Sequence, residues 1–98
     1  MESLNFLKKL EDVIQDRLEN ASTESYTAGL AAAGDLKVVQ KLGEEAVELV
    51  ISAAAEDNAR VTAEGADLLY HLLVLLRLRG LRLADVVAEL ESRHAGAG

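Results

Sequence analysis

Residues 68–76 read Leu-Leu-Tyr-His-Leu-Leu-Val-Leu-Leu and form one of the most apolar runs of the chain. A helix that is hydrophobic on nearly every side must be buried on every side. We therefore expect this run to lie at the centre of a helical bundle or at the seam between two subunits. With His71 and Arg77 interrupting it, the run also falls well short of the ~20 apolar residues that a membrane span requires.

Apolar residues recur at helical spacing on both sides of this run, and no stretch alternates as a β-strand does. Ser3 and Asp35 are expected to cap the first and third helices, whereas Gly34 and Gly80 end the second and fourth. Residues 95–98 are expected to form a frayed tail. The pattern predicts helices at residues 4–20, 26–33, 35–55, 59–79 and 83–93.

This pattern predicts an all-α fold, a small bundle of four to five helices. The 98 residues are enough for one domain, spanning residues 1–98. Half of the residues are apolar, which exceeds what so short a chain buries alone, so we expect a homodimer to complete the bundle. The side of the third helix that faces the core is expected to carry Val39, Val47, Val50, Ile51 and Ala54.

The net charge of −7 excludes several classes of partner. Non-specific nucleic-acid binding needs a basic face, and docking on an anionic membrane needs one too. The chain has no cysteine, which excludes disulfides and thiolate zinc sites and fits a reducing compartment. Because residues 1–5 also lack the apolar core of a signal peptide, we expect a cytoplasmic protein.

Acidic residues gather beside the apolar core on two neighbouring helices. At about 100° per residue, Glu44, Glu45 and Glu48 share one side of the third helix with two lysines, and Glu64, Asp67 and His71 lie within about 60° on the fourth. Both groups flank apolar stripes, so they can face each other across an antiparallel pair. The two lysines are Lys37 and Lys41.

Two interpretations of these acids stand side by side. Carboxylates that converge repel one another unless a cation lies between them, and oxygen-only ligands suit Mg²⁺ or Mn²⁺. Lysines beside such an ion suit a polyphosphate substrate. Alternatively, the acids form an ordinary solvated helix face with weak surface pairs, and His71 is a core or interface histidine. Glu64 and Asp67 favour the metal interpretation, since no matching bases are expected beside them.

The motif Glu44-Glu45-Ala46-Val47-Glu48, followed by Glu64-Gly65-Ala66-Asp67, resembles the E-E-x-x-E … E-x-x-D pattern of MazG-type all-α nucleotide pyrophosphohydrolases. The Ser25-Tyr26-Thr27 motif, the Lys41-Leu42-Gly43 motif and residues 66–76 are similar to one branch, the phosphoribosyl-ATP pyrophosphatases of histidine biosynthesis. The resemblance covers about two-thirds of the chain.

This resemblance implies Mg²⁺-dependent hydrolysis of 1-(5-phosphoribosyl)-ATP to 1-(5-phosphoribosyl)-AMP and pyrophosphate by a helical homodimer. It implies that Glu45, Glu48, Glu64 and Asp67 hold the metal. It further implies that Glu44 or Glu45 takes part in catalysis and that Lys37 and Lys41 meet phosphate oxygens. Ser25, Tyr26, Thr27 and His71 are then expected to line the substrate pocket.

The chain departs from the family pattern at three positions, none of them in the acidic set. Gln40 stands where the family often has a lysine, and Arg82 where it often has a capping serine. Gly65 replaces a more usual alanine inside a helix, which costs up to about 1 kcal/mol. Two other functions remain as alternatives: a house-cleaning (d)NTP pyrophosphatase of the same superfamily and a non-catalytic helical dimerisation module.

Overall fold

A computed structural model describes residues 3–20 and 34–97, and this part of the chain contains helices and no strand. The all-α prediction is therefore confirmed. The helix predicted at residues 26–33 lies outside the described residues. The elements are a 3-10 turn, Ser3–Asn5, and the helices α1, Phe6–Glu19; α3, Asp35–Ala55; α4, Asn58–Leu78; and α5, Leu83–Ala97.

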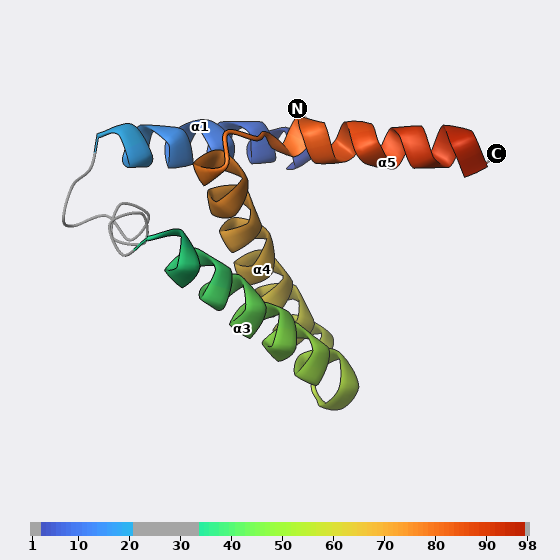
Figure 1. The fold of residues 1–98 in the computed structure, drawn as a ribbon. Coiled ribbons are helices and arrows are strands. Elements are labelled where there is room, and N and C mark those ends of the chain that lie inside the picture. The colour runs from blue at the N-terminus through green and yellow to red at the C-terminus, as the bar shows by residue number, and fades with distance from the viewer. Residues whose placement is uncertain (1–2, 21–33, 98) are drawn as a thin grey trace.

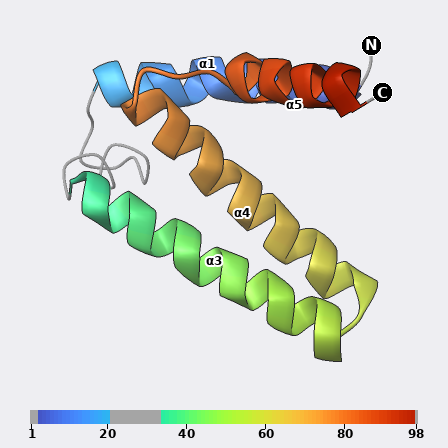
Figure 2. The same cartoon turned by 45° about the vertical axis from the view of Figure 1, so that its right-hand side comes forward.

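Helices α3 and α4 pack against each other as an antiparallel hairpin that forms one arm of the molecule (Figure 1). Helix α1 packs against the end of α4 at the other end of the hairpin, and α5 leads away from it (Figures 1 and 2). A side-chain contact supports this crossing, because Arg77 Nε donates to Gln15 Oε1 at 2.9 Å. The acidic residues of α3 and α4 are thus held on two helices that pack together directly.

Local sequence signals set the ends of this hairpin. The Asp57 side chain accepts a hydrogen bond from the backbone N–H of Arg60 at 3.0 Å and so caps α4. At the far end of α4, Gly80 adopts a φ of 75°, a left-handed conformation that glycine reaches without strain. Gly34 precedes α3 with a φ of 99°. Gly80 lies where the sequence predicted the fourth helix to end, whereas the helix that Gly34 was predicted to end is outside the described residues.

Two cap predictions were wrong. Ser3 begins a 3-10 turn and Asn5, without a side-chain cap, precedes α1. Asp35 is the first residue of α3, and Gly34 occupies the cap position. Helix α5 continues through Ala97, and the frayed tail expected at residues 95–98 stays a prediction.

The core is small and lies where α1, the start of α3 and the second half of α4 meet. Its fully buried side chains are Ile14, Val38, Leu73 and Val74. Leu76 is also buried. The apolar run thus supplies three of the five buried apolar residues of the described chain, as expected of a helix at the centre of the fold.

The predicted inward stripe of α3 was wrong. Val39, Val47, Val50 and Ile51 are exposed by 49–67%, whereas Val38 and Ser52 are buried. Ala54 is exposed as well. The reason is that the side of α3 facing α4 follows residues 38, 42, 45, 49 and 52, which includes a glutamate and a serine. The polar residues therefore take the inner side and leave the valines outside.

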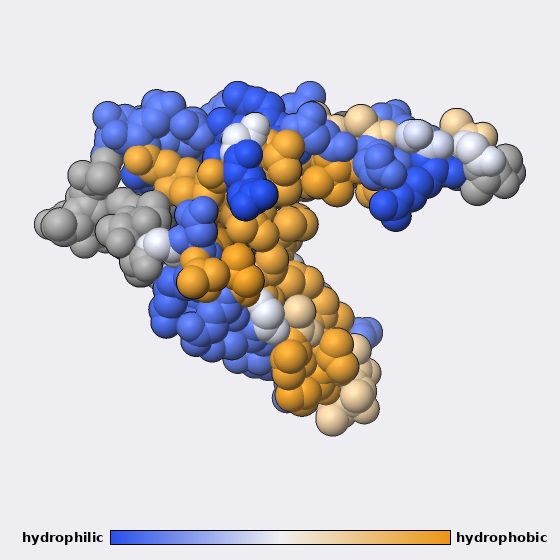
Figure 3. Space-filling model, viewed as in Figure 1, coloured by the Kyte–Doolittle hydropathy of each residue, from blue (hydrophilic) through white to orange (hydrophobic). Residues whose placement is uncertain are grey.

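This arrangement leaves much apolar surface uncovered in the single chain. Figure 3 shows hydrophobic surface along the hairpin, on the side that faces the open angle below α5. Exposed residues on α5 include Val87 and Leu90. Among the described residues, no helix combines the length and the hydropathy that crossing a bilayer would require.

Candidate active site

Three glutamates converge between α3 and α4. Glu45 and Glu48 come from consecutive turns of α3, and Glu64 comes from the second turn of α4. One carboxylate oxygen from each lies within 4.8 Å of the others. These three residues, hereafter the carboxylate group, meet because the hairpin brings the two acidic sides together.

Two of the three members of the carboxylate group, Glu45 and Glu64, each have a buried carboxylate oxygen. Glu64 is only 4% exposed, although a glutamate is rarely buried so far. Within the described residues, Glu64 Oε2 and Glu45 Oε2 are both buried and have no hydrogen-bond donor. Buried acceptors without a partner destabilise a fold, so such a pair calls for a ligand.

The surroundings of Glu64 raise its pKa above the usual 4.5. The main cause is loss of hydration on burial, followed by the neighbouring carboxylate of Glu48. Arg60 acts in the opposite direction but does not outweigh these effects. Without a further cation, ionised Glu64 is therefore unfavourable in this position.

Arg60 is the site residue that the sequence analysis missed. Its Nη2 lies 2.5 Å from Glu64 Oε1 and its Nε lies 3.2 Å from Glu56 Oε2. The prediction that no base stands beside Glu64 was therefore wrong. The signal was available, since Glu56, Arg60 and Glu64 follow one another at i,i+4 spacing, which pairs side chains on a helix.

Glu44 lies outside the carboxylate group and is exposed. Gln40 Nε2 donates to its Oε2 at 2.9 Å, and Lys41 Nζ lies 3.6 Å from its Oε1. The hydrogen bond from Gln40, with the charges of Lys41 and Lys37, lowers the pKa of Glu44. The two lysines and Glu44 thus form a mixed-charge patch next to the carboxylate group on α3.

The remaining predicted site residues have different positions. Asp67 is exposed and falls outside the group within 4.8 Å, although its charge contributes to the raised pKa of Glu64. His71 is buried, and its Nδ1 lies 2.8 Å from the carbonyl oxygen of Asp67. The Tyr70 ring stands edge-on to the imidazole, with centroids 5.5 Å apart. Residues 25–27 lie outside the described residues.

The carboxylate group has the composition of a site for a hard cation. Three carboxylates supply oxygen only, the donor type that Mg²⁺ and Mn²⁺ prefer over softer metals. The two buried oxygens without a donor are free to accept a bond from such an ion. With two lysines nearby, the arrangement can bind an ion together with the phosphates of a substrate.

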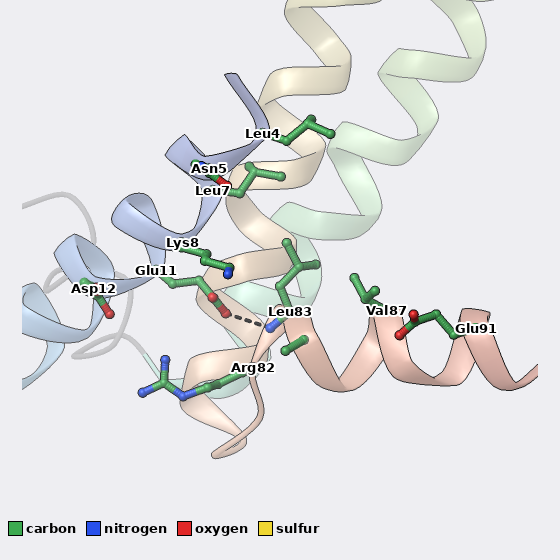
Figure 4. Close-up of a pocket in the computed structure, with 11 residues that line it drawn as sticks. Leu4, Asn5, Leu7, Lys8, Glu11, Asp12, Arg82, Leu83, Val87 and Glu91 are labelled. Carbon is green, nitrogen blue, oxygen red and sulfur yellow. Dashed lines mark hydrogen bonds between the residues drawn. The ribbon is translucent and has the colours of Figure 1, made fainter. Parts of the chain in front are cut away.

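A cavity of about 680 Å³ lies elsewhere, between the first half of α1 and the start of α5 (Figure 4). Within it, a hydrogen bond links α1 to the start of α5: Glu11 Oε2 accepts from the backbone N–H of Leu83 at 2.6 Å. Leu4, Leu7 and Val87 give it apolar walls. None of the carboxylate-group residues lines this cavity.

Comparison with known proteins gives a consistent result. Residues 7–94 match the family model described as phosphoribosyl-ATP pyrophosphohydrolase. The phosphoribosyl-ATP pyrophosphatase of Pyrobaculum neutrophilum is 56% identical over 91 residues, which cover 93% of this chain and 97% of that protein. The phosphoribosyl-ATP pyrophosphatase of Rhizobium rhizogenes is 47% identical over 92 residues, covering 94% and 88%.

A third relative is a longer protein. The histidine biosynthesis bifunctional protein of Bacteroides thetaiotaomicron is 48% identical over 94 residues, which cover 96% of this chain but 46% of that protein. The match to the family model spans nearly all of the chain, and the two pyrophosphatases are covered almost end to end. The chain belongs to the phosphoribosyl-ATP pyrophosphohydrolase family.

Proposed function

We propose that the carboxylate group is the metal site at which this chain hydrolyses 1-(5-phosphoribosyl)-ATP, a step of histidine biosynthesis. The products are 1-(5-phosphoribosyl)-AMP and pyrophosphate. The observation that carries the proposal is the convergence of Glu45, Glu48 and Glu64 with two buried oxygens that have no donor. Family membership and the names of the relatives support the choice of substrate.

Glu45, Glu48 and Glu64 would hold Mg²⁺, or Mn²⁺ in its place, and Asp67 would assist directly or through water. Asp67 has the right location for this role, one helical turn beyond Glu64 and exposed. When bound, the ion supplies a positive charge that neutralises the departing pyrophosphate. The protein's part is to hold the acids in place before substrate arrives, which a packed helix hairpin does well.

The exposed patch beside the metal site contacts the substrate. Lys37 and Lys41 bind phosphate oxygens, whereas Glu44, which is ionised at neutral pH, orients the attacking water and is the first candidate for the base. The water oxygen bonds to the α-phosphorus, and the bridging oxygen leaves with the β- and γ-phosphates. Glu45 is the second candidate for the base. Ser25, Tyr26, Thr27 and His71 are proposed to line the pocket.

The proposal includes a homodimer. The valines on the outer side of α3 and the apolar residues of α5 are exposed in the single chain, and contiguous apolar surface of this kind marks an interface. A second subunit would cover it. A cytoplasmic location is also proposed, in keeping with a chain that has no cysteine.

Pyrophosphate release from phosphoribosyl-ATP by the purified chain tests the function. We expect Glu48→Gln and Asp67→Asn to lower kcat/KM by about 100-fold or more while circular dichroism shows a folded protein. Glu89→Gln is the matched control, because Glu89 is an exposed glutamate on α5 that pairs with Arg93. Full activity in both site variants would reject the assigned roles, and a preference for dNTPs in a substrate panel would reject the substrate.

A further inference from the structure

Arg60 contacts the carboxylate group in a way that the proposed reaction does not explain. Its guanidinium bridges Glu56, at the end of α3, and Glu64 on α4, with atom separations of 3.2 and 2.5 Å. Glu48, on the opposite helix, is close enough for its charge to raise the pKa of Arg60. The guanidinium therefore sits against the carboxylate group and carries the opposite charge.

Arg60 is the only base that forms an ion pair with a member of the carboxylate group within the described ranges 3–20 and 34–97. Three acids within 4.8 Å repel one another in the absence of a cation. The positive charge of Arg60, paired with Glu64, relieves part of this repulsion. In the metal-free protein, Arg60 thus neutralises part of the negative charge that a divalent ion would neutralise in the metal-bound protein.

The two occupants cannot both use Glu64 in the same way. Glu64 Oε1 accepts from Arg60, and a cation bound to this carboxylate lies next to a guanidinium of like charge. Arg60 has room to withdraw, since its side chain is 57% exposed. It also has a second partner in Glu56, whose side chain is 40% exposed and which is not a member of the carboxylate group.

We propose that Arg60 is an internal counter-cation that competes with the metal for Glu64 and sets the metal affinity of the site, with Glu56 as its resting partner when the metal is bound. The inference rests on the proposed function, because it requires the carboxylate group to be the metal site. Arg60 is a positioning residue in this account and does not contact the reacting atoms.

Titration of Mg²⁺ and of Mn²⁺ into the metal-free protein by calorimetry tests this role. We expect Arg60→Gln to bind either ion about three- to tenfold more tightly than the wild type, since a neighbouring positive charge is removed from a partly solvated site. The metal-free variant melts at a lower temperature than the wild type. Raising the NaCl concentration reduces the difference in affinity, as a charge effect requires and a packing effect does not.

Two further variants serve as controls for the effect of charge at Arg60. Arg93→Gln removes an equivalent i,i+4 pair on α5, with Glu89, and leaves the metal affinity unchanged. Arg60→Lys retains the charge but loses the two-pronged contact, and we expect an intermediate affinity. Should Arg60→Gln fail to fold, the lysine variant carries the comparison.

The outcomes separate this inference from the proposed function. Equal or weaker metal binding by Arg60→Gln overturns the counter-cation role, as does a raised KM for the nucleotide with unchanged metal affinity, which would make Arg60 a phosphate contact. No metal uptake by either protein overturns both proposals. Uptake by the variant but not by the wild type supports the competition.

Discussion

Replacing Gly65 with alanine is expected to stabilise this protein. Gly65 lies inside α4, and among the described residues no atom beyond its chain neighbours and the backbone of its own helix lies within 4 Å of the position a Cβ would take. Glycine loses more backbone entropy than alanine when a helix forms. The substitution therefore improves the helix without displacing a neighbour.

The expected gain follows from this geometry. Gly→Ala inside a helix is worth up to about 1 kcal/mol, which raises the Tm of a domain of this size by roughly 4–8 °C at most. Urea denaturation at a fixed protein concentration measures it as a higher midpoint with an unchanged m-value. Gly80→Ala serves as the control, because a φ of 75° disfavours a side chain and should lower stability by about 1–2 kcal/mol.

A destabilised Gly65→Ala would refute the reasoning. Such a result means that some group outside the described chain, such as a helix of a second subunit, packs against the glycine. Measuring the midpoint at several protein concentrations distinguishes this case, because only an interface defect makes the loss depend on concentration.

Three other perturbations have defined outcomes. Because the pKa of Glu64 is raised in the fold, its contribution to stability is complete below the usual 4.5 and is lost as the pH rises through the higher folded value; metal-free wild type should therefore lose Tm from pH 4.5 upward, and Glu64→Gln should lose less in parallel melts. Glu11→Ala removes the acceptor of the Leu83 N–H and should cost about 1.5–3 kcal/mol in urea titrations, with faster hydrogen exchange at that amide. Leu73→Ala, at a fully buried position, should cost about 2–5 kcal/mol, and a loss below 1 kcal/mol would mean that the core lies elsewhere.

The sequence alone predicted the features of this fold that are set by residues close to one another along the chain. Gly80 marks the end of α4 because a residue without a side chain takes its φ of 75° easily. The apolar run at residues 68–76 was expected to be central because it has no polar side to expose. The facing of the acidic sides of α3 and α4 followed from helical angles and a short connection.

Features that are set by packing between helices were harder to predict from the sequence. The apolar count on α3 favoured Val47 and Val50 as core residues, but the α4-facing side carries Glu45 and Ser52. When a helix has apolar residues on two sides, its sequence does not show which of the two sides packs against the rest of the same chain. Arg60 was missed for a different reason, since its pairing with Glu64 is visible at i,i+4 spacing but gains meaning only when the carboxylate group is assembled.

Binding of Mn²⁺ or Mg²⁺ to the purified chain, compared with Glu48→Gln and Glu64→Gln, tests the central claim most directly. The account predicts saturable binding to the wild type and at least about tenfold weaker binding to each variant, since each loses one of three ligands. Glu89→Gln should bind as the wild type does. Equal binding by all four proteins, or none by any, would contradict the assignment of the carboxylate group as the metal site.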